Sequence, residues 1–333
     1  MKKYRIQEFI KNLANPKISD QDIADIYKIA DSSNWNFFKS RLLIVQNGIQ
    51  NNLIQPIYYR PFDIRFTYFH SILRRMQEKV LTNLIQDNLG LLAMRQVASG
   101  DNQYTHFMVC NQIVDNRSFF SNRGRPSVFP LYTYPNTENN QTNLFLEKTP
   151  NLSPKFLEVI KNKLGKIPTP EQIFYYAYSI FHSPTYRTRY AEFLKIDFPR
   201  LPLTSNQKLF NSLAIKGEEL VNLHLMKSET LDNLITTYQQ IGENQITEVT
   251  YNSELQRVYI NKQNYFTDIP QHIWEFKIGG YQVLDKWLKD RKNANRGLSE
   301  EEIIHYQKIV VALTETLRLM QEIDSLIPGF PIE

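Results

Sequence analysis

The sequence predicts a mixed α/β (α+β) fold with a helical N-terminal segment, several small sheets and a long amphipathic C-terminal helix. Two observations lead to this prediction. Apolar residues recur at helical spacing near both ends of the chain, and aromatic and β-branched runs separated by polar stretches fill residues 56–135. At 333 residues the chain is longer than one typical compact domain, so we expect two or three packed units.

Residues 1–50 carry the first helical signals. Asp20 and Asp22 precede an apolar pattern that ends at Ile29, and a second pattern runs from Trp35 to Val45. We expect a first α/β subdomain over 55–140, because the texture changes there to the strand-like runs IYYRPFDIRFTYFH, GLLAMRQV, HFMVCNQIV and VFPLYTYP. The polar, Asn-rich residues 136–150 predict an exposed connection.

Residues 151–333 are expected to form a second unit of helices and a β-hairpin. Ser153-Pro154 and Thr169-Pro170 each place a capping residue before a proline, which predicts two helices. The second, EQIFYYAYSIFHS, is apolar around much of its circumference and should be buried. We also expect a short helix at 206–214 and a hairpin near 247–267, where EVTYN and RVYINKQNYF have strand composition.

The long C-terminal helix has the clearest sequence pattern. Ser299 and Glu302 form an S-x-x-E capping box, and apolar residues then repeat at alternating spacings of three and four from Ile303 to Met320. The resulting stripe predicts an amphipathic helix whose apolar face packs on the core or on a partner.

Composition and charge exclude several classes of protein. With 42% hydrophobic and 22% charged residues the chain is expected to fold, and its apolar runs are too short for a transmembrane helix. The N-terminus lacks the continuous apolar core of a secretory signal, so we expect a cytoplasmic protein. A single cysteine, Cys110, excludes an intramolecular disulfide and a multi-cysteine metal site, and its strand-like flanks predict a buried thiol.

The net charge of +5 is unevenly distributed. Residues 1–150 contain 18 Lys and Arg against 12 Asp and Glu, a balance of +6, which leaves −1 for the remainder. A localised basic surface attracts polyanions such as nucleic acid.

Sequence motifs for catalysis are missing. The chain has no phosphate-binding GxxxxGK[ST] loop, no GxGxxG loop, no HExxH and no GxSxG elbow, so we predict no catalytic residue and no metal site. Pro61-Phe62-Asp63 and Glu275-Phe276-Lys277 resemble fragments of a PD-x-D/E-x-K nuclease motif. A structural carboxylate–lysine pair is the competing interpretation of Glu275 and Lys277.

Six stretches resemble the C-terminal specificity region of Type ISP restriction-modification enzymes. They are IYYRPFDIRFTYFH (57–70), GLLAMRQV (90–97), VFPLYTYP (128–135), YAYSIFHSPTYRTRYAEFLKIDFPRLPL (176–203), IPQHIWEFKIGGYQVLDKWLKDRK (269–292) and SEEEIIHYQKIVVALTETLRLMQEID (299–324). Related methyltransferase–restriction fusions share the HSPTYRTRY and FPRLP segments. The family combines nuclease, ATP-driven motor, adenine methyltransferase and target-recognition parts in one polypeptide.

The resemblance implies a DNA target-recognition module. The adenine methyltransferase signature Asn/Asp-Pro-Pro-Tyr/Phe is missing, so the chain is expected to be a fragment or a separately encoded subunit that binds duplex DNA without modifying it. S-adenosylmethionine, ATP and magnesium are expected only in the other parts of a full-length enzyme. The implied partners are double-stranded DNA and the methyltransferase and motor or nuclease domains of the same polypeptide or complex, with no membrane.

Residue types that read base edges and bind phosphates are Arg, Lys, Asn and Gln. They gather in the loop at 115–127, where a flexible Gly124 lies among Asn116, Arg117, Asn122, Arg123 and Arg125. A solvated loop is the alternative. Arg74 and Arg75 stand where the resembling family tends to carry Arg-Pro-Arg, and they predict a backbone contact or an internal salt bridge. Arg95 and Gln96 follow a predicted strand and contact DNA unless Arg95 pairs with Asp101 or Asp115.

Two further basic groups are candidates for phosphate contacts. Arg187 and Arg189 alternate with tyrosines after the buried helix, which suits phosphate binding or a packing hub of stacked rings and guanidinium groups. The second group, at the basic end of WLKDRKNANR, could instead complement a helix C-terminus. It comprises Lys289, Arg291, Lys292 and Arg296, with Lys286 before them.

Two functions of other classes remain open at this point. One is a nuclease or other hydrolase built from dispersed residues such as Asp63 and Glu275. The other is a protein-only interaction subunit that binds a methyltransferase through exposed apolar surface.

Overall fold

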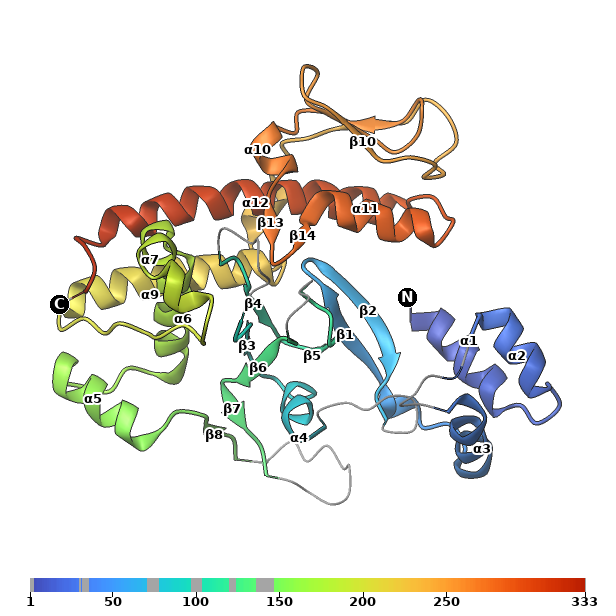
Figure 1. The fold of residues 1–333 in the computed structure, drawn as a ribbon, viewed down its shortest axis with the longest axis horizontal. Helices are drawn as coiled ribbons and strands as arrows, with labels where there is room; N and C mark the ends of the chain where they lie inside the picture. Colours follow the sequence, from blue (N-terminus) through green and yellow to red (C-terminus); the bar gives the residue numbers. More distant parts are fainter. Residues whose placement is uncertain are drawn as a thin grey trace.

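The computed structural model describes residues 3–29, 31, 36–70, 78–96, 104–119, 124–135 and 147–332. Figure 1 shows helices at the N-terminal end, small sheets in the middle, and a second group of helices at the other end and along the top. The prediction of a mixed α/β fold with small sheets and a long C-terminal helix is confirmed.

Three N-terminal helices form a unit with a core of its own. They are α1 (Lys3–Ala14), α2 (Asp20–Tyr27) and α3 (Phe37–Asn47), and the core also takes in Leu53, Ile54 and Tyr68. Arg41 of α3 is buried here, and it donates from Nε to Leu13 O at 3.1 Å and from Nη2 to Asn15 O at 2.8 Å. Because a buried guanidinium needs acceptors for its donors, these bonds fix α3 against the end of α1.

Two three-stranded sheets occupy the middle. The first has the order β2-β1-β5, with β1 (Ile54–Arg60) antiparallel to β2 (Asp63–Tyr68) and parallel to β5 (Ile113–Val114). The second is antiparallel with the order β4-β3-β6, from β3 (Gly90–Ala93), β4 (Phe107–Cys110) and β6 (Ser127–Pro130). Shorter elements beside them are η1 (Asn51–Leu53), α4 (Glu78–Leu81), η2 (Thr82–Leu84) and the pair β7 (Tyr132–Thr133) and β8 (Thr149–Pro150).

Cys110 lies at the end of β4 and is fully buried. Its thiol is 3.5 Å from Gly90 O on the neighbouring strand, and burial raises its pKa. The prediction of a small buried residue is confirmed.

The remainder is mostly helical. The helices are α5 (Pro154–Leu164), α6 (Pro170–His182), α7 (Pro184–Arg189), α8 (Ala191–Leu194), α9 (Gln207–His224), η3 (Glu229–Asp232), α10 (Gln271–Trp274), α11 (Val283–Asn293) and α12 (Glu300–Leu326). A four-stranded antiparallel sheet follows α9, in the order β10-β11-β12-β9, from β9 (Tyr238–Gln239), β10 (Thr250–Asn252), β11 (Arg257–Tyr259) and β12 (Tyr265–Phe266). The small hairpin of β13 (Lys277–Ile278) and β14 (Tyr281–Gln282) precedes α11.

The predicted caps are present at three helices. Ser153 Oγ accepts from Phe156 N at α5, and Thr169 and Ser299 form capping boxes with Gln172 and Glu302 at α6 and α12. The predicted hairpin near 247–267 is β10 and β11. The helix expected at 206–214 is wrong in length: α9 continues to His224, because Leu220, Val221 and Leu223 extend its buried face beyond the predicted end.

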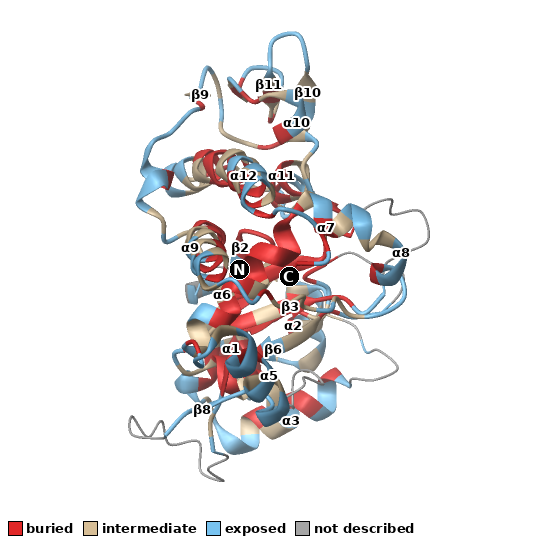
Figure 2. Ribbon diagram, turned by 90° about the vertical axis from the view of Figure 1, so that its left-hand side faces the viewer, coloured by how far each residue is buried: buried red, intermediate tan, exposed pale blue. Residues whose placement is uncertain are grey.

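One hydrophobic core runs from the central sheets through the C-terminal helices. Figure 2 shows buried residues concentrated in α6, α9, α12 and the strands behind them. Helices α6 and α9 cross closely because Gly217 has no side chain: a Cβ there would lie 1.8 Å from Tyr175 O. Residues 55–140 and 151–333 share this core. The predicted boundary between two subdomains is therefore not marked by separate hydrophobic cores, and it stays a prediction.

Buried polar groups from three helices meet inside this core. Thr316 on α12 donates to Ala312 O at 2.6 Å, so its oxygen accepts from His224 Nε2 at 2.9 Å. His224 Nδ1 then accepts from Tyr178 Oη at 2.6 Å, and the imidazole is neutral. Burial and the nearby Arg187 guanidinium lower the pKa of His224 to about 3.

This neutral histidine predicts a pH-dependent stability. In the unfolded chain His224 takes up a proton below its ordinary pKa of 6.5, whereas in the folded protein it stays neutral to about pH 3. The contribution of His224 to stability is therefore fully present above pH 6.5 and falls by about 1.4 kcal/mol per pH unit between these limits. Between pH 7 and pH 5, the free energy of unfolding measured in urea should depend less steeply on pH for His224→Gln than for the unsubstituted chain. His272→Gln, at an exposed position, is the matched control substitution.

Candidate nucleic-acid interface

A buried arginine joins α11 to the β1–β2 hairpin and to α12. Arg291 lies over the Trp287 ring at 3.2 Å, its two Nη atoms are each 3.3 Å from an oxygen of Asp63, and its Nε is 3.3 Å from Glu302 Oε1. Arg296 binds both oxygens of the same Glu302 at 2.6 Å. The guanidinium plane thus bridges a strand and two helices.

The two carboxylates of this network stay ionised over a wide pH range. Burial alone would raise the pKa of Asp63, but Arg291 and Arg65 lower it below its ordinary value. Burial has the same effect on Glu302, and the bonds from Arg296 and from Ser299 N outweigh it and lower the pKa to about 2. The paired charges therefore persist at neutral pH.

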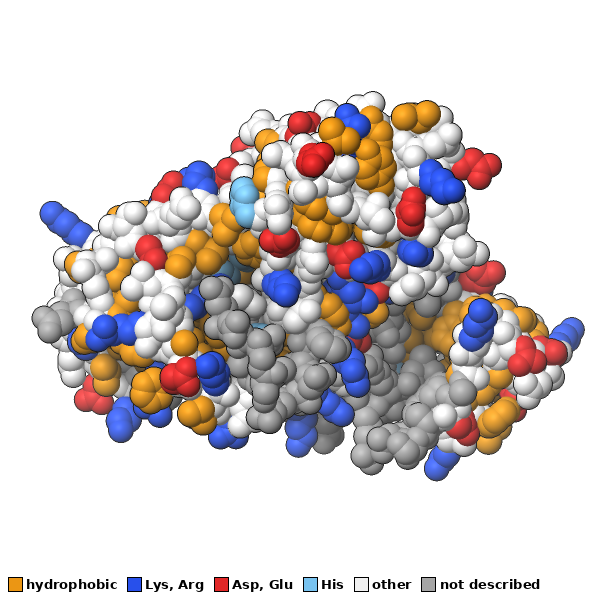
Figure 3. Space-filling model, turned by 45° about the horizontal axis from the view of Figure 1, so that its top comes forward, with side chains coloured by type: hydrophobic (Ala, Val, Ile, Leu, Met, Phe, Trp, Pro, Cys, Tyr) orange, Lys and Arg blue, Asp and Glu red, His pale blue; other side chains and the backbone are white. Residues whose placement is uncertain are grey.

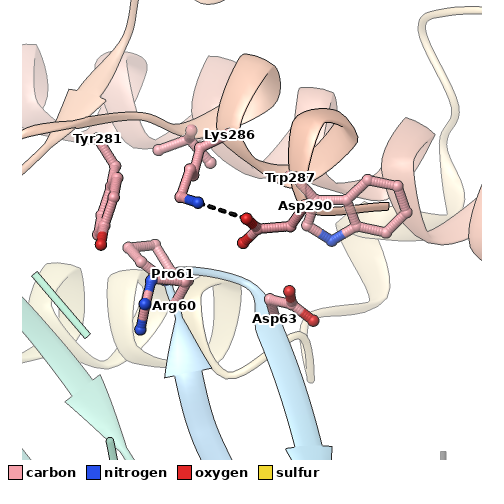
Figure 4. A pocket seen from close by; sticks show the side chains of 8 residues that line it. Arg60, Pro61, Asp63, Tyr281, Lys286, Trp287 and Asp290 are labelled. Carbon is pink, nitrogen blue, oxygen red and sulfur yellow. Dashed lines mark hydrogen bonds and ion pairs between the residues drawn. The ribbon is translucent and has the colours of Figure 1, made fainter. Parts of the chain in front are cut away.

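Helix α12 also contacts the turn of the β1–β2 hairpin. Phe62 adopts a left-handed φ of 60°, and its carbonyl accepts from His305 Nε2 of α12 at 2.7 Å. Figure 4 shows Lys286, Trp287 and Asp290 of α11 facing Arg60, Pro61 and Asp63 of the hairpin. The cavity between them is only about 10 Å³, so α11 rests directly on the turn.

Cations gather around two tyrosines at this contact. Arg60 lies 3.9 Å and Arg65 lies 3.6 Å from the centre of the Tyr59 ring, while Lys286 lies 5.5 Å from that of Tyr281. Carboxylates hold the same groups: Arg60 pairs with Asp115 at 3.1 Å, Arg65 with Asp290 at 3.5 Å, and Lys286 also with Asp290. Lys289, one turn further along α11, pairs with Asp285 at 2.8 Å. In Figure 3, basic and acidic side chains lie side by side in the middle of the face shown.

The loop after β5 reaches this contact. Asp115 Oδ1 accepts from Arg117 N at 2.8 Å, and Arg117 O accepts from Tyr281 Oη at 3.3 Å. These bonds leave the Arg117 side chain exposed and Asn116 partly exposed. We call the resulting cluster the α11 surface. It comprises Arg60, Arg65, Arg117, Lys286, Lys289 and Lys292.

A second group of predicted residues lies at one end of the β4-β3-β6 sheet. Ala93 and Ser127 are the last pair of the β3–β6 ladder, so Arg95 and Arg125 each lie two residues beyond the same end of the sheet. Both side chains are exposed, as is Gln96. Arg95 Nε pairs with Asp197 at 3.0 Å, a partner that the sequence analysis did not consider.

The predicted site residues therefore differ in their exposure. Exposed side chains among the described residues are Arg95, Gln96, Arg117, Arg125, Arg189, Lys289 and Lys292. Arg291 is buried, Arg296 is bound to Glu302, and the guanidinium of Arg187 donates to Phe181 O at 2.7 Å inside the protein. Since these three are engaged internally, we leave them out of the proposed contact set. Arg74, Arg75, Asn122 and Arg123 lie outside the described residues.

Sequence reasoning missed Arg60 and Arg65. Both belong to IYYRPFDIRF, where each arginine is near tyrosine or phenylalanine, a pattern that suits stacking. Because both arginines are far from α11 in sequence, the sequence alone did not indicate that they lie next to α11 in the folded protein.

The carboxylates named for a nuclease lie in ordinary structural settings. Asp63 is buried between two arginines, and Glu275 ends α10, where it accepts from Gln271 Nε2 at 2.8 Å. Within the described stretches, no group of three His, Cys, Asp or Glu side chains could hold a metal ion. None of the helices in the described part of the chain is long and apolar enough to cross a membrane.

The family model of the Type ISP C-terminal specificity domain matches residues 1–322. The chain belongs to this family. The sequence-based prediction of a specificity region of a Type ISP-like restriction-modification enzyme is therefore confirmed. No curated protein matches the chain.

Solved structures with the same fold are much longer chains. The DrdV–DNA complex, solved by cryo-electron microscopy, aligns with a TM-score of 0.66 and 19% identity, over 96% of this chain and 33% of that chain. The ATP-dependent Type ISP enzyme LlaBIII bound to DNA aligns with a TM-score of 0.67 and 20% identity, over 98% and 22%. A nuclease-deletion mutant of the Type ISP enzyme LlaGI with a DNA substrate mimic aligns with a TM-score of 0.64 and 18% identity, over 99% and 31%. The present chain thus spans a third or less of each.

The Arg291 bridge predicts a large energetic coupling between Asp63 and Arg291. Asp63→Asn removes one carboxylate from a buried guanidinium and should cost about 3 kcal/mol of unfolding free energy. In an Arg291→Met background the same substitution should cost at least about 1 kcal/mol less. Urea unfolding of the four proteins measures this difference.

Asp285→Asn provides the control, because Asp285 pairs with the more exposed Lys289 and should cost less than about 1 kcal/mol. An equal cost of Asp63→Asn in both backgrounds would show that the bridge does not link the hairpin to α11.

Proposed function

We propose that this chain binds duplex DNA and reads its target sequence, using the α11 surface for phosphates and the adjoining loops for base edges. The observation that carries the proposal is the convergence of cations from three segments distant in sequence: the β1–β2 hairpin, the loop after β5, and α11. A cluster assembled from separate segments supplies the several phosphate contacts that give binding its electrostatic component.

The ion pairs within the α11 surface allow such binding. Lys289 is 53% exposed, so its ion pair with Asp285 contributes little stability in water. Arg65 is 27% exposed and pairs with the buried carboxylates of Asp63 and Asp290, which hold its guanidinium in place. Arg117 and Lys292 are exposed and pair with no carboxylate among the described residues. A DNA phosphate can therefore approach Arg117, Lys289 and Lys292 without breaking a buried pair, while Asp115 and Asp290 keep Arg60 and Arg65 in position.

Side chains that can discriminate bases lie in the loop after β5 and at the end of the β4-β3-β6 sheet. The side-chain amides of Asn116 and Gln96 can form two hydrogen bonds with the edge of adenine. The guanidinium groups of Arg117 and Arg125 can form two hydrogen bonds with the edge of guanine. Asn122, Arg123, Arg74 and Arg75 remain in the proposal as sequence-based predictions. Arg189 remains as an exposed phosphate contact.

Chemistry on DNA is assigned to other parts of the enzyme. S-adenosylmethionine, ATP and magnesium would bind to methyltransferase, motor and nuclease parts in the same polypeptide or complex. The proposed setting of the module is the cytoplasm, where it would meet foreign DNA.

Neutralising exposed cations should weaken DNA binding without unfolding the protein. Arg117→Gln, Arg125→Gln and Lys292→Gln together remove three proposed phosphate or base contacts. The slope of log affinity against log salt concentration should become less steep by about 3. Fluorescence anisotropy with duplex DNA at several salt concentrations measures this slope.

A matched control removes the same charge elsewhere. Lys161, Lys163 and Lys166 are exposed near the end of α5, which lies far from α11 in both Figure 1 and Figure 2. Their replacement by glutamine should leave the slope within about 1 of the unsubstituted chain. If both triple variants lowered the salt slope equally, DNA binding would depend on the total positive charge of the chain and not on the proposed surface.

A further inference from the structure

An apolar cavity of about 460 Å³ lies between α7, α8 and the segment 196–202. Its walls are mainly aromatic and aliphatic, and they include Tyr186, Tyr190, Phe193, Leu194, Phe198 and Leu201. This volume falls in the range of pockets that bind ligands or side chains of a partner. The α11 surface shares none of these residues.

The segment that forms one wall is tied to the body at several points. Tyr186 Oη donates to Arg200 O at 2.7 Å, and Tyr176 Oη donates to Pro202 O at 2.9 Å. The Phe198 ring meets Phe129 of β6 edge to face at 5.4 Å. Because these contacts are made by the protein's own residues, the cavity is formed before any ligand binds.

The mouth of the cavity exposes large apolar side chains. Phe193 is 70% exposed and Ile196 is 66% exposed, although both belong to types that are usually buried. In Figure 2, α8 lies at the margin of the molecule, away from the buried centre. An exposed apolar rim around a concave apolar site marks a surface that another molecule covers.

The lining favours an apolar protein segment over a nucleobase. The charged residues that line the cavity are Asp197 and Arg200, and Asp197 is already bound to Arg95. The hydroxyl of Tyr186 is bound to Arg200 O. A base extruded from DNA would need partners for its polar edges, whereas large apolar side chains need none.

Other parts of a long polypeptide would supply such a segment. The solved structures with this fold devote 22% to 33% of their chains to it, and the family is described as a C-terminal domain. We propose that the cavity is the docking site for a segment with large apolar side chains from the methyltransferase part of the same enzyme. This inference rests on the proposed function, because it assumes a DNA-reading module that works with a methyltransferase.

Docking here would position residues proposed to read DNA. Asp197 and Ile196 on the cavity rim contact Arg95 and Gln96: the Arg95–Asp197 distance is 3.0 Å, and Gln96 Nε2 is 3.5 Å from Ile196 O. A segment seated against this rim would therefore fix the end of the β4-β3-β6 sheet relative to the methyltransferase.

Thiol labelling of Phe193→Cys tests the proposal. Cys110 is the only cysteine in the sequence and is fully buried, so the new thiol is the one expected to react with N-ethylmaleimide. We expect labelling at least about tenfold slower in the complete enzyme than in the 333-residue chain, with no DNA present. Ile241→Cys, 68% exposed in the separate β9–β12 region, calibrates the reagent in both proteins.

Two outcomes overturn the proposal. Equal labelling rates in the chain and the complete enzyme would leave the cavity without a docked segment. Slower labelling that requires added duplex DNA would assign the cavity to nucleic acid instead.

A separate readout distinguishes failure of this inference from failure of the proposed function. Phe193→Cys lies outside the α11 surface, so its affinity for duplex DNA should stay within about twofold of the unsubstituted chain. If the unsubstituted chain bound no duplex, the proposed function would fail, while the labelling rates would still decide the docking.

Discussion

The buried Arg291 guanidinium is the constraint on which the proposed interface depends. It stacks on Trp287 and binds Asp63 of the hairpin and Glu302 of α12, so one side chain sets the position of three elements. A buried cation without both carboxylates would be costly, and this cost disfavours any arrangement in which α11 lifts from the hairpin. The lysines on the outer side of α11 thus have a fixed relation to the arginines below them.

This arrangement separates structural from exchangeable charges. Arg291 is 8% exposed at its side chain, whereas Lys289 is 53% exposed, although they lie two residues apart on one helix. The Arg291 guanidinium is desolvated and needs protein partners, whereas the Lys289 ammonium group remains hydrated and can bind a phosphate. One short basic run, DKWLKDRK, therefore supplies both the anchor of the helix and a proposed contact to DNA.

Local signals predicted much of the fold, and distant contacts limited the prediction of the site. Ser299 and Glu302 fixed the start of α12, because a capping box depends on neighbours three residues apart. The sequence alone predicted the same role in DNA binding for Arg291 and Lys292. Only the exposed Lys292 remains available for a DNA contact, because Arg291 binds Asp63, 228 residues away in sequence. Arg60 and Arg65 escaped notice for the same reason. The strand pairing that brings Arg95 and Arg125 to the same end of a sheet likewise joins distant residues.

Lysine acetylation of the chain, read by mass spectrometry with and without duplex DNA, tests the central claim most directly. The exposed lysines of α11, Lys289 and Lys292, should lose reactivity when duplex is bound, because phosphates cover them. Lys161, Lys163 and Lys166 near the end of α5 should react equally in both states. Protection of the α5 lysines, with Lys289 and Lys292 unchanged, would contradict the account and move the DNA to the opposite end of the molecule.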